Sequence, residues 1–172
     1  TSLENLDVSD TSLTAFDFSQ ITTLESVDIS GTEILTEIGF GRFTLSEIIE
    51  FTADEVSINS TKLVQTLYDS CENLSIQNAG LSNISSYYYS QYYTKLTNIN
   101  LSGNSFVFIP RLGLQYKTLV SPIEELILQN NDLRCNIYSF GVLDFDYYKP
   151  FLAGVTSKLD FKNNAISAAY IE

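Results

Sequence analysis

Histidine is absent from this chain of 172 residues, methionine is absent too, and only two cysteines occur. The lack of histidine removes the commonest general base and the commonest zinc ligand together. Cys71 and Cys135 form neither a C-x-x-C pair nor a zinc site, and Gly39 to Gly41 lack the lysine of a phosphate loop. The remaining acid–base candidates, Asp144 and Asp146, are typical of a solvated turn. We therefore predict that the chain is not an enzyme and holds no metal and no cofactor.

Basic residues are scarce as well. Nine Lys and Arg stand against 21 Asp and Glu, which gives a net charge of −12. Nucleic-acid binding depends on cations that neutralise phosphates, so this balance argues against DNA or RNA as a partner. No apolar run approaches the ~18 residues that a membrane span requires. We predict no nucleic-acid partner and no membrane span.

An eleven-residue pattern recurs seven times, with leucine-like residues at positions one, four, six and eleven and a small polar residue at position nine. The clearest unit is Leu96, Ile99, Leu101, Asn104 and Phe106. The seven units start at residues 3, 24, 46, 71, 96, 123 and 156. Positions four and six are apolar around a mostly polar position five, which indicates a strand with one buried face. Such a unit cannot bury its apolar side alone and must stack on its neighbours.

The pattern L-x-x-L-x-L-x-x-N-x-L resembles the leucine-rich repeat family over nearly the whole chain. The resemblance implies an α/β solenoid with a parallel concave sheet, and with a convex side that is extended in the early units and holds short helices or loops in the later ones. Helical spacing behind Ser60 and in the tyrosine-rich stretch from Tyr87 to Tyr93 fits that expectation. Tyr87 and Tyr88 could instead contact a ligand.

Position nine is expected to turn inward and satisfy backbone groups where the strand bends. This structural ladder consists of Thr11, Thr32, Asp54, Asn104, Asn131 and Asn164, with Ala79 interrupting it.

Positions three, five and seven are expected to face the concave groove. The candidate ligand-binding residues there are Asp7, Asp28, Glu50, Ser75, Gln77, Asn98, Asn100, Ser102, Gln129, Lys158, Asp160 and Lys162. Acids stacked in the first three units, amides and hydroxyls in the middle and lysines at the end suggest a graded recognition surface. The plainer alternative is that any exposed sheet face must be polar.

We predict one domain over residues 1–172 that recognises a protein ligand, or alternatively a glycan. Two rival interpretations are a structural spacer and the substrate-selecting part of a larger effector enzyme. The repeat sequence, rich in Ser, Thr and Asn, resembles those of bacterial surface or secreted repeat proteins. We therefore expect an extracellular or cell-surface location, with the cytoplasm as the alternative. The first unit starts without a cap, so we expect a segment of a larger or processed protein, with self-association through that end. Cys71 and Cys135 are expected to be free thiols, with Cys71 buried.

Overall fold

The computed structural model describes residues 3–14, 21, 23–32, 49–56, 71–82, 95–110, 123–134 and 154–165. Within these residues the chain forms seven short strands and no helix. The strands are β1 (Asn5–Asp7), β2 (Ser26–Asp28), β3 (Glu50–Thr52), β4 (Asn73–Ser75), β5 (Asn98–Asn100), β6 (Glu125–Ile127) and β7 (Lys158–Asp160).

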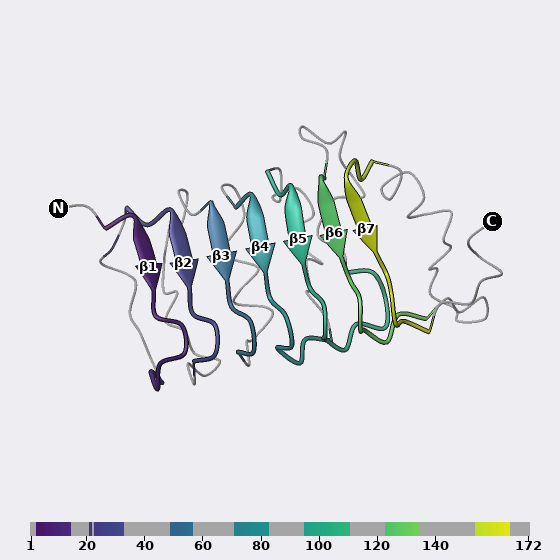
Figure 1. The fold of residues 1–172 in the computed structure, drawn as a ribbon, viewed down its shortest axis with the longest axis horizontal. Helices are drawn as coiled ribbons and strands as arrows, with labels where there is room; N and C mark the ends of the chain where they lie inside the picture. Colours follow the sequence, from purple (N-terminus) through teal and green to yellow (C-terminus); the bar gives the residue numbers. More distant parts are fainter. Residues whose placement is uncertain are drawn as a thin grey trace, which may run out of the picture.

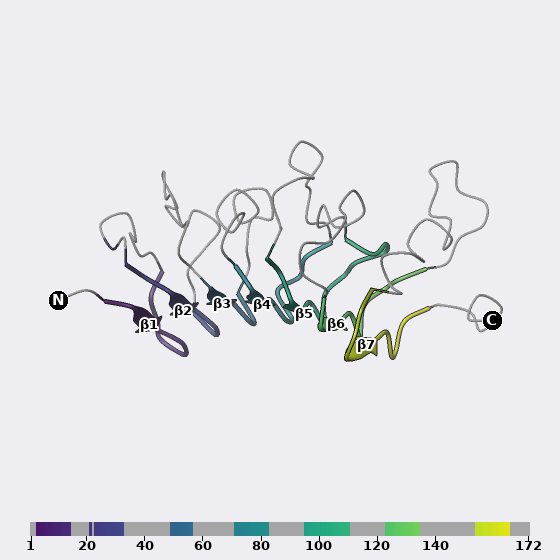
Figure 2. The same ribbon diagram turned by 90° about the horizontal axis from the view of Figure 1, so that it is seen from above.

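The seven strands form one parallel sheet in sequence order (Figure 1). Seen from above, they lie along one side of the molecule (Figure 2). Each strand pairs only with the strands of the units before and after it. The predicted parallel sheet of stacked units is therefore confirmed, and the architecture is that of a solenoid-like repeat.

Backbone hydrogen bonds repeat identically from unit to unit. The amide at position six donates to the carbonyl at position five of the next unit, as Val8 does to Asp28 at 3.0 Å and Leu101 to Ile127 at 2.9 Å. The amide at position eight donates to the carbonyl at position seven of the next unit, as in Gly103 to Gln129 at 3.0 Å. The ladder thus runs past the strands into the turns that follow them.

The core is a continuous column of apolar side chains from the inward positions. Phe51, Ile76, Leu101 and Leu128 have no exposed surface. Protection weakens at the ends of the sheet, where Leu3 is 43% exposed and Leu159, in β7, is 44% exposed. Each unit is covered by its neighbours, so the terminal units keep apolar surface. Self-association through the first unit stays a prediction.

The register of unit three differs from the predicted one by two residues. Val27 pairs with Phe51, and Phe51 pairs with Leu74, so Phe51 rather than Ile49 occupies position four. A shift of two residues keeps the alternation of the strand, and the sequence pattern therefore tolerates both registers. The observed register leaves Ile49 37% exposed and buries Val56 completely at position nine. It also keeps the Asp54 carboxylate out of the core, where an ionised group would be costly.

Asp54 is consequently not part of the position-nine ladder. Counted from Phe51, it occupies position seven, and Glu50 moves from position five to position three, beside Ser26 and Asn73. The expected column of three stacked acids does not exist, because Asp28 pairs with Thr52 instead of Glu50.

The asparagines at position nine satisfy backbone groups of two units at once. The Asn104 amide nitrogen donates to the carbonyls of Leu101 at 3.0 Å and of Ile76, in the preceding unit, at 2.7 Å. Its oxygen accepts the amides of Ala79 and Leu81 at 3.1 and 3.0 Å. The bonds of Asn104 therefore complete the turn of the unit in which Ala79 interrupts the ladder.

Asn131 and Asn164 repeat this arrangement. Their side chains donate to Leu101 and Leu128 of the respective preceding units, at 3.0 and 2.8 Å. The threonines are more local, since Thr11 and Thr32 donate only to the carbonyl three residues earlier, each at 2.7 Å. A hydroxyl reaches its own turn, whereas the longer amide also joins neighbouring turns.

Position eight adopts the left-handed backbone conformation in all seven units. These residues are Asp10, Gly31, Glu55, Asn78, Gly103, Asn130 and Asn163, with φ between 52° and 68°. Glycine and asparagine accept this region readily, whereas glutamate does so at a cost. The left-handed residue turns the chain out of the direction of the strand. Each strand is therefore short.

The side chains at position eight also stack. Asn163 donates to the Asn130 side-chain oxygen at 2.7 Å. Asp10 lies over Gly31 and Asn78 lies over Gly103, so closely that a Cβ atom on either glycine would meet the side-chain oxygen above it. Glycine at these two places therefore leaves room for the side chain of the preceding unit, whereas its backbone conformation is also adopted by non-glycine residues in the other five units.

Several sequence predictions fall outside the described residues. They concern the helices after Ser60 and in the tyrosine stretch from Tyr87 to Tyr93, the aromatic insertion with Asp144 and Asp146, and Cys135. Cys71 is within them and is a buried free thiol, as predicted.

Candidate functional site

The candidate site is the polar face of the sheet, which we define as the side chains at positions three, five and seven. Strand alternation turns these positions away from the core that positions four and six fill. All twelve predicted ligand-binding residues lie in these three rows. Glu50 is in the position-three row instead of the predicted position-five row, and Asp54 joins the position-seven row.

The acids and amides at position five accept hydrogen bonds from their own turns. Asp7, Asp28, Asn100 and Asp160 each accept the backbone amide two residues later, at 2.9, 2.9, 3.2 and 3.0 Å. This is an Asx turn, in which a short side chain replaces a backbone acceptor. These residues thus hold the end of the strand, a role that needs no ligand.

Asp7 shows the electrostatic effect of such a turn. The Ser9 hydroxyl donates to its Oδ1 at 2.6 Å, and the Ser9 amide donates to the same oxygen. Both bonds stabilise the ionised carboxylate and lower the pKa of Asp7 below its usual value, the hydroxyl contributing most.

Units three and four satisfy the position-seven amide differently, because Thr52 and Ser75 replace the aspartate at position five. The Asp54 amide donates to the Ser30 hydroxyl at 3.1 Å, and the Gln77 amide donates to Asp54 Oδ1 at 2.7 Å. Each acceptor comes from position seven of the preceding unit. The two units are therefore joined by side chains as well as by the backbone ladder.

The Asp54 carboxylate is fully engaged in this row. Its Oδ1 also accepts the Ser75 hydroxyl at 2.9 Å, and its Oδ2 accepts the Gln77 side-chain amide at 2.8 Å. The Ser102 hydroxyl continues the row by donating to Gln77 Oε1 at 2.8 Å. Three of the predicted ligand-binding residues, Ser75, Gln77 and Ser102, thus bond to one another or to Asp54.

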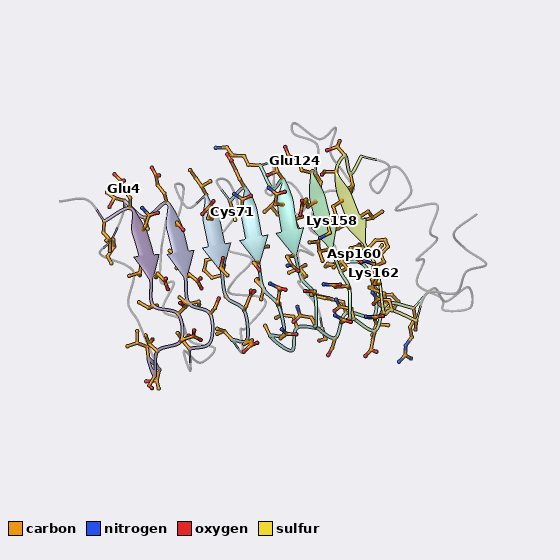
Figure 3. All side chains as sticks on the ribbon, in the orientation of Figure 1. Glu4, Cys71, Glu124, Lys158, Asp160 and Lys162 are labelled. Atoms are coloured by element: carbon orange, nitrogen blue, oxygen red, sulfur yellow. The ribbon has the colours of Figure 1, made fainter. Side chains whose placement is uncertain are left out.

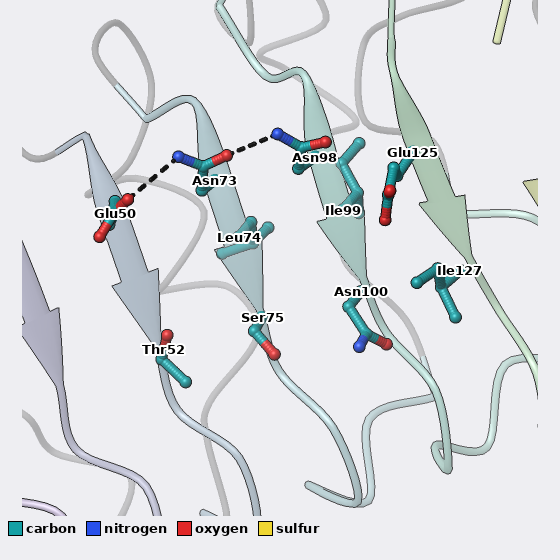
Figure 4. A pocket seen from close by; sticks show the side chains of 10 residues that line it. All are labelled: Glu50, Thr52, Asn73, Leu74, Ser75, Asn98, Ile99, Asn100, Glu125 and Ile127. Atoms are coloured by element: carbon teal, nitrogen blue, oxygen red, sulfur yellow. Dashed lines mark hydrogen bonds between the residues drawn. The ribbon is translucent and has the colours of Figure 1, made fainter. Parts of the chain in front are cut away.

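An open groove of about 340 Å³ crosses the polar face from β3 to β6. Figure 4 shows the side chains that line it, which are Glu50, Thr52, Asn73, Leu74, Ser75, Asn98, Ile99, Asn100, Glu125 and Ile127. Four of the predicted residues meet there, namely Glu50, Ser75, Asn98 and Asn100. Asp7, Asp28 and the three residues of unit seven lie outside it.

Six lining residues were not among the predicted ligand-binding residues, namely Thr52, Asn73, Leu74, Ile99, Glu125 and Ile127. Asn73 and Glu125 share the position-three row with Glu50 and Asn98. Ile127 is the apolar exception at position five and is 8% exposed. The repeat register alone would have found Asn73, Glu125 and Ile127, since it places them beside residues that were predicted.

The C-terminal end of the polar face mixes charges, as the sequence suggests. Lys162 lies 3.6 Å from the Asp160 carboxylate, and Lys158 is exposed on the same strand as Asp160 (Figure 3). Asp160 is nevertheless 8% exposed, and it also accepts the Lys162 backbone amide. Among the described residues, the exposed Lys162 thus pairs with Asp160, whereas Lys158 has no ion-pair partner.

In the part of the chain that the structure describes, no three His, Cys, Asp or Glu side chains come close enough together to bind a metal ion. The buried Cys71 thiol donates to the Asn73 carbonyl at 3.3 Å, and burial raises its pKa to about 12. A thiol with this pKa stays protonated and unreactive at neutral pH.

Among the described residues, no helix has the length and apolar character needed to cross a membrane. Comparisons with models of known protein families, with curated proteins and with solved structures find no match for this chain.

Proposed function

We propose that this chain is a leucine-rich repeat module that recognises a protein ligand through its polar face and catalyses no reaction. The ordered parallel strands, the left-handed turn at position eight and the inward asparagines at position nine support the family. The observation that carries the function is the groove, where half-exposed polar side chains from four consecutive strands stand in register. An extracellular or cell-surface location stays a prediction from the resemblance alone.

The lining of the groove favours a protein ligand over a glycan. Sugar rings are commonly held against aromatic side chains, which offer an apolar face with a polar edge. None of the ten residues that line this groove is aromatic. They offer instead carboxylates, amides and hydroxyls around Leu74, Ile99 and Ile127, a mixture suited to the backbone and side chains of a polypeptide.

One observation favours the second candidate, a structural spacer. The Asx turns of Asp7, Asp28, Asn100 and Asp160 explain much of the polar character of the face without any ligand. A spacer would need these bonds and nothing else from the polar face. The groove supports recognition over the spacer, because its residues are less completely bonded to one another than those of the position-seven row.

Thr52→Tyr tests recognition by filling the groove. The Thr52 side chain lines the groove and makes no hydrogen bond to the described residues, and tyrosine suits a strand. Ser105→Tyr is the matched control, because Ser105 is exposed and lies outside the groove. Both variants should unfold at the temperature of the parent chain.

The measurement is affinity capture from the native medium of the protein, followed by titration of the purified partner against all three chains. We expect one partner whose affinity falls at least about tenfold for Thr52→Tyr and is unchanged for Ser105→Tyr. Equal affinity for the two variants would contradict recognition at the groove. Failure to capture any partner, with folded chains, would favour the spacer.

A further inference from the structure

The position-three row of the groove is a line of two carboxylates with two amides between them. Along this row Glu50, Asn73, Asn98 and Glu125 follow one another on β3, β4, β5 and β6. Asn73 donates to Glu50 Oε1 at 3.4 Å, and Asn98 donates to Asn73 Oδ1 at 2.7 Å. In both bonds, drawn as dashed lines in Figure 4, the acceptor lies on the strand nearer the N-terminal end of the sheet.

This row cannot satisfy itself. An ionised carboxylate only accepts hydrogen bonds, and an amide that donates to one neighbour along the row turns its oxygen toward the other. The row has three gaps and two amides, so one gap lacks a donor whichever way the amides are turned. The bond to Glu50 fixes the orientation of Asn73 and, through it, that of Asn98.

The unsatisfied gap lies between Asn98 and Glu125. The Asn98 oxygen points toward β6, where the Glu125 carboxylate stands (Figure 4). Among the described residues, the Glu125 carboxylate has no hydrogen-bond donor, and Lys158, its neighbour in the same row on β7, forms no ion pair with it. The position-seven row makes a contrast, since Asp54 receives three donors from the next unit. Two acceptors thus face one gap at the wall of an open groove.

We propose that this gap binds the ammonium or guanidinium group of a lysine or arginine in an extended segment of the protein ligand. These side chains carry donors and no acceptor, which is the complement of the Asn98 oxygen and the Glu125 carboxylate. The net charge of −12 favours a cationic segment. The inference rests on the proposed function and names the chemistry of its ligand.

Ile127 supplies the apolar part of the site. It stands two residues after Glu125 on β6, on the same face, and lines the groove (Figure 4). The methylene stem of a lysine or arginine can cover Ile127 while its charged head reaches Glu125. The groove crosses four strands, so an extended chain lying across them brings such a side chain to β6.

The probe is a terminally blocked Gly-Ser-Lys-Ser-Gly peptide, titrated into the whole chain while the side-chain amide signals of Asn98 are followed by NMR. We expect saturable shifts at Asn98, and none with the same peptide carrying acetyl-lysine, which has lost its charge. Methylammonium is titrated as the free-amine comparison and should bind at least about tenfold more weakly, because it has neither the methylene stem that covers Ile127 nor a peptide backbone.

Glu125→Gln is the decisive variant, because a glutamine amide supplies the donor that the gap lacks and the fold is kept. We expect about a tenfold loss of peptide affinity, the equivalent of one charge-assisted hydrogen bond. Glu124→Gln removes the same charge one residue away, where Glu124 is exposed and outside the groove, and should bind the peptide as the parent does.

Equal affinity of the Glu125→Gln chain and the parent, equal binding of the acetyl-lysine peptide, or equal binding of methylammonium would each overturn the inference. Loss of affinity in Glu124→Gln as well would reduce the effect to net charge and would also overturn it. Partner capture that depends on Thr52 while the peptide experiment fails would leave the proposed function standing and refute only the cationic site.

Discussion

Replacing Gly103 with alanine tests whether the stacked left-handed turns determine the stability of the sheet. Gly103 has a φ of +68°, and a Cβ atom there would overlap Oδ1 of Asn78 and lie 2.9 Å from its Cγ. Gly80 also has a φ of +68°, but a Cβ there would have no atom within 4 Å. The two glycines share the conformation and differ in the space around them.

Comparing Gly80→Ala with Gly103→Ala separates the energy cost of the left-handed conformation from that of the overlap with Asn78. Alanine in the left-handed region costs about 1 kcal/mol, and part of this is offset because alanine lowers the entropy of the unfolded chain. Gly80→Ala should therefore lower the free energy of unfolding by less than about 1 kcal/mol. Gly103→Ala carries the overlap with Asn78 as well, and the exposed Asn78 side chain must leave its rotamer to relieve it, which costs about 0.5–1.5 kcal/mol more.

The assay is equilibrium urea unfolding followed by circular dichroism, with Asn78→Gly as the partner in a double-mutant cycle. Glycine accepts the left-handed conformation of Asn78 and removes the overlapping oxygen. The chain with both Asn78→Gly and Gly103→Ala should recover most of the stability difference, a coupling of about 0.5–1.5 kcal/mol. Equal losses for Gly103→Ala and Gly80→Ala, or the absence of coupling, would refute the reasoning.

Three further predictions concern single residues. Glu55→Asn should raise the free energy of unfolding by about 0.5–1 kcal/mol, because asparagine suits the φ of 61°. The control Glu72→Asn, in an exposed site outside the turns, should leave the free energy of unfolding unchanged, and equal effects of the two substitutions in thermal melts would contradict the role of the turn. Asn104→Ala should lower the free energy of unfolding by about 2–5 kcal/mol, since it leaves buried backbone amides of the preceding unit without an acceptor. Thr32→Ala loses one local hydrogen bond and should lower it by about 1 kcal/mol. Similar losses for the two variants in urea unfolding would argue against a bond that joins two units at Asn104. Burial raises the pKa of Cys71 from 9.0 to about 12, so between these values the thiol stays neutral in the folded chain but ionises in the unfolded chain. Its contribution to stability is full below pH 9 and falls as the pH rises toward 12, by up to about 1.4 kcal/mol per pH unit. Cys71→Val should remove this contribution to the pH dependence of the free energy of unfolding.

The alternation of apolar and polar residues was enough to predict the strands and their faces, but not the register of unit three. A shift of two residues leaves the alternation intact, so Ile49 and Phe51 were equally good candidates for position four. The left-handed position did not decide either, because it falls on Ala53 in one register and on Glu55 in the other. Burial of the Asp54 carboxylate is what separates the two, and that is a tertiary effect.

The Asx turns of the polar face can be recognised in the sequence. Asp7 and Ser9, Asp28 and Ser30, and Asn100 and Ser102 repeat one Asx-x-Ser spacing, which is typical of an Asx turn. The donor deficit between Asn98 and Glu125 left no such trace. It depends on the pairing of β5 with β6 across an insertion and on the orientation of two amides, and neither follows from local spacing.

The asparagines of position nine impose an order on biosynthesis. The backbone amides of Ala79 and Leu81 bond to a side chain that follows them by 25 and 23 residues. A ribosome adds that stretch in about 1–5 s, and until then the turn of unit four lacks its acceptor. Asn131 and Asn164 repeat the delay for the two units before them. Each of these units is completed by the one synthesised after it, so a translational pause between units holds an unfinished turn at the growing end.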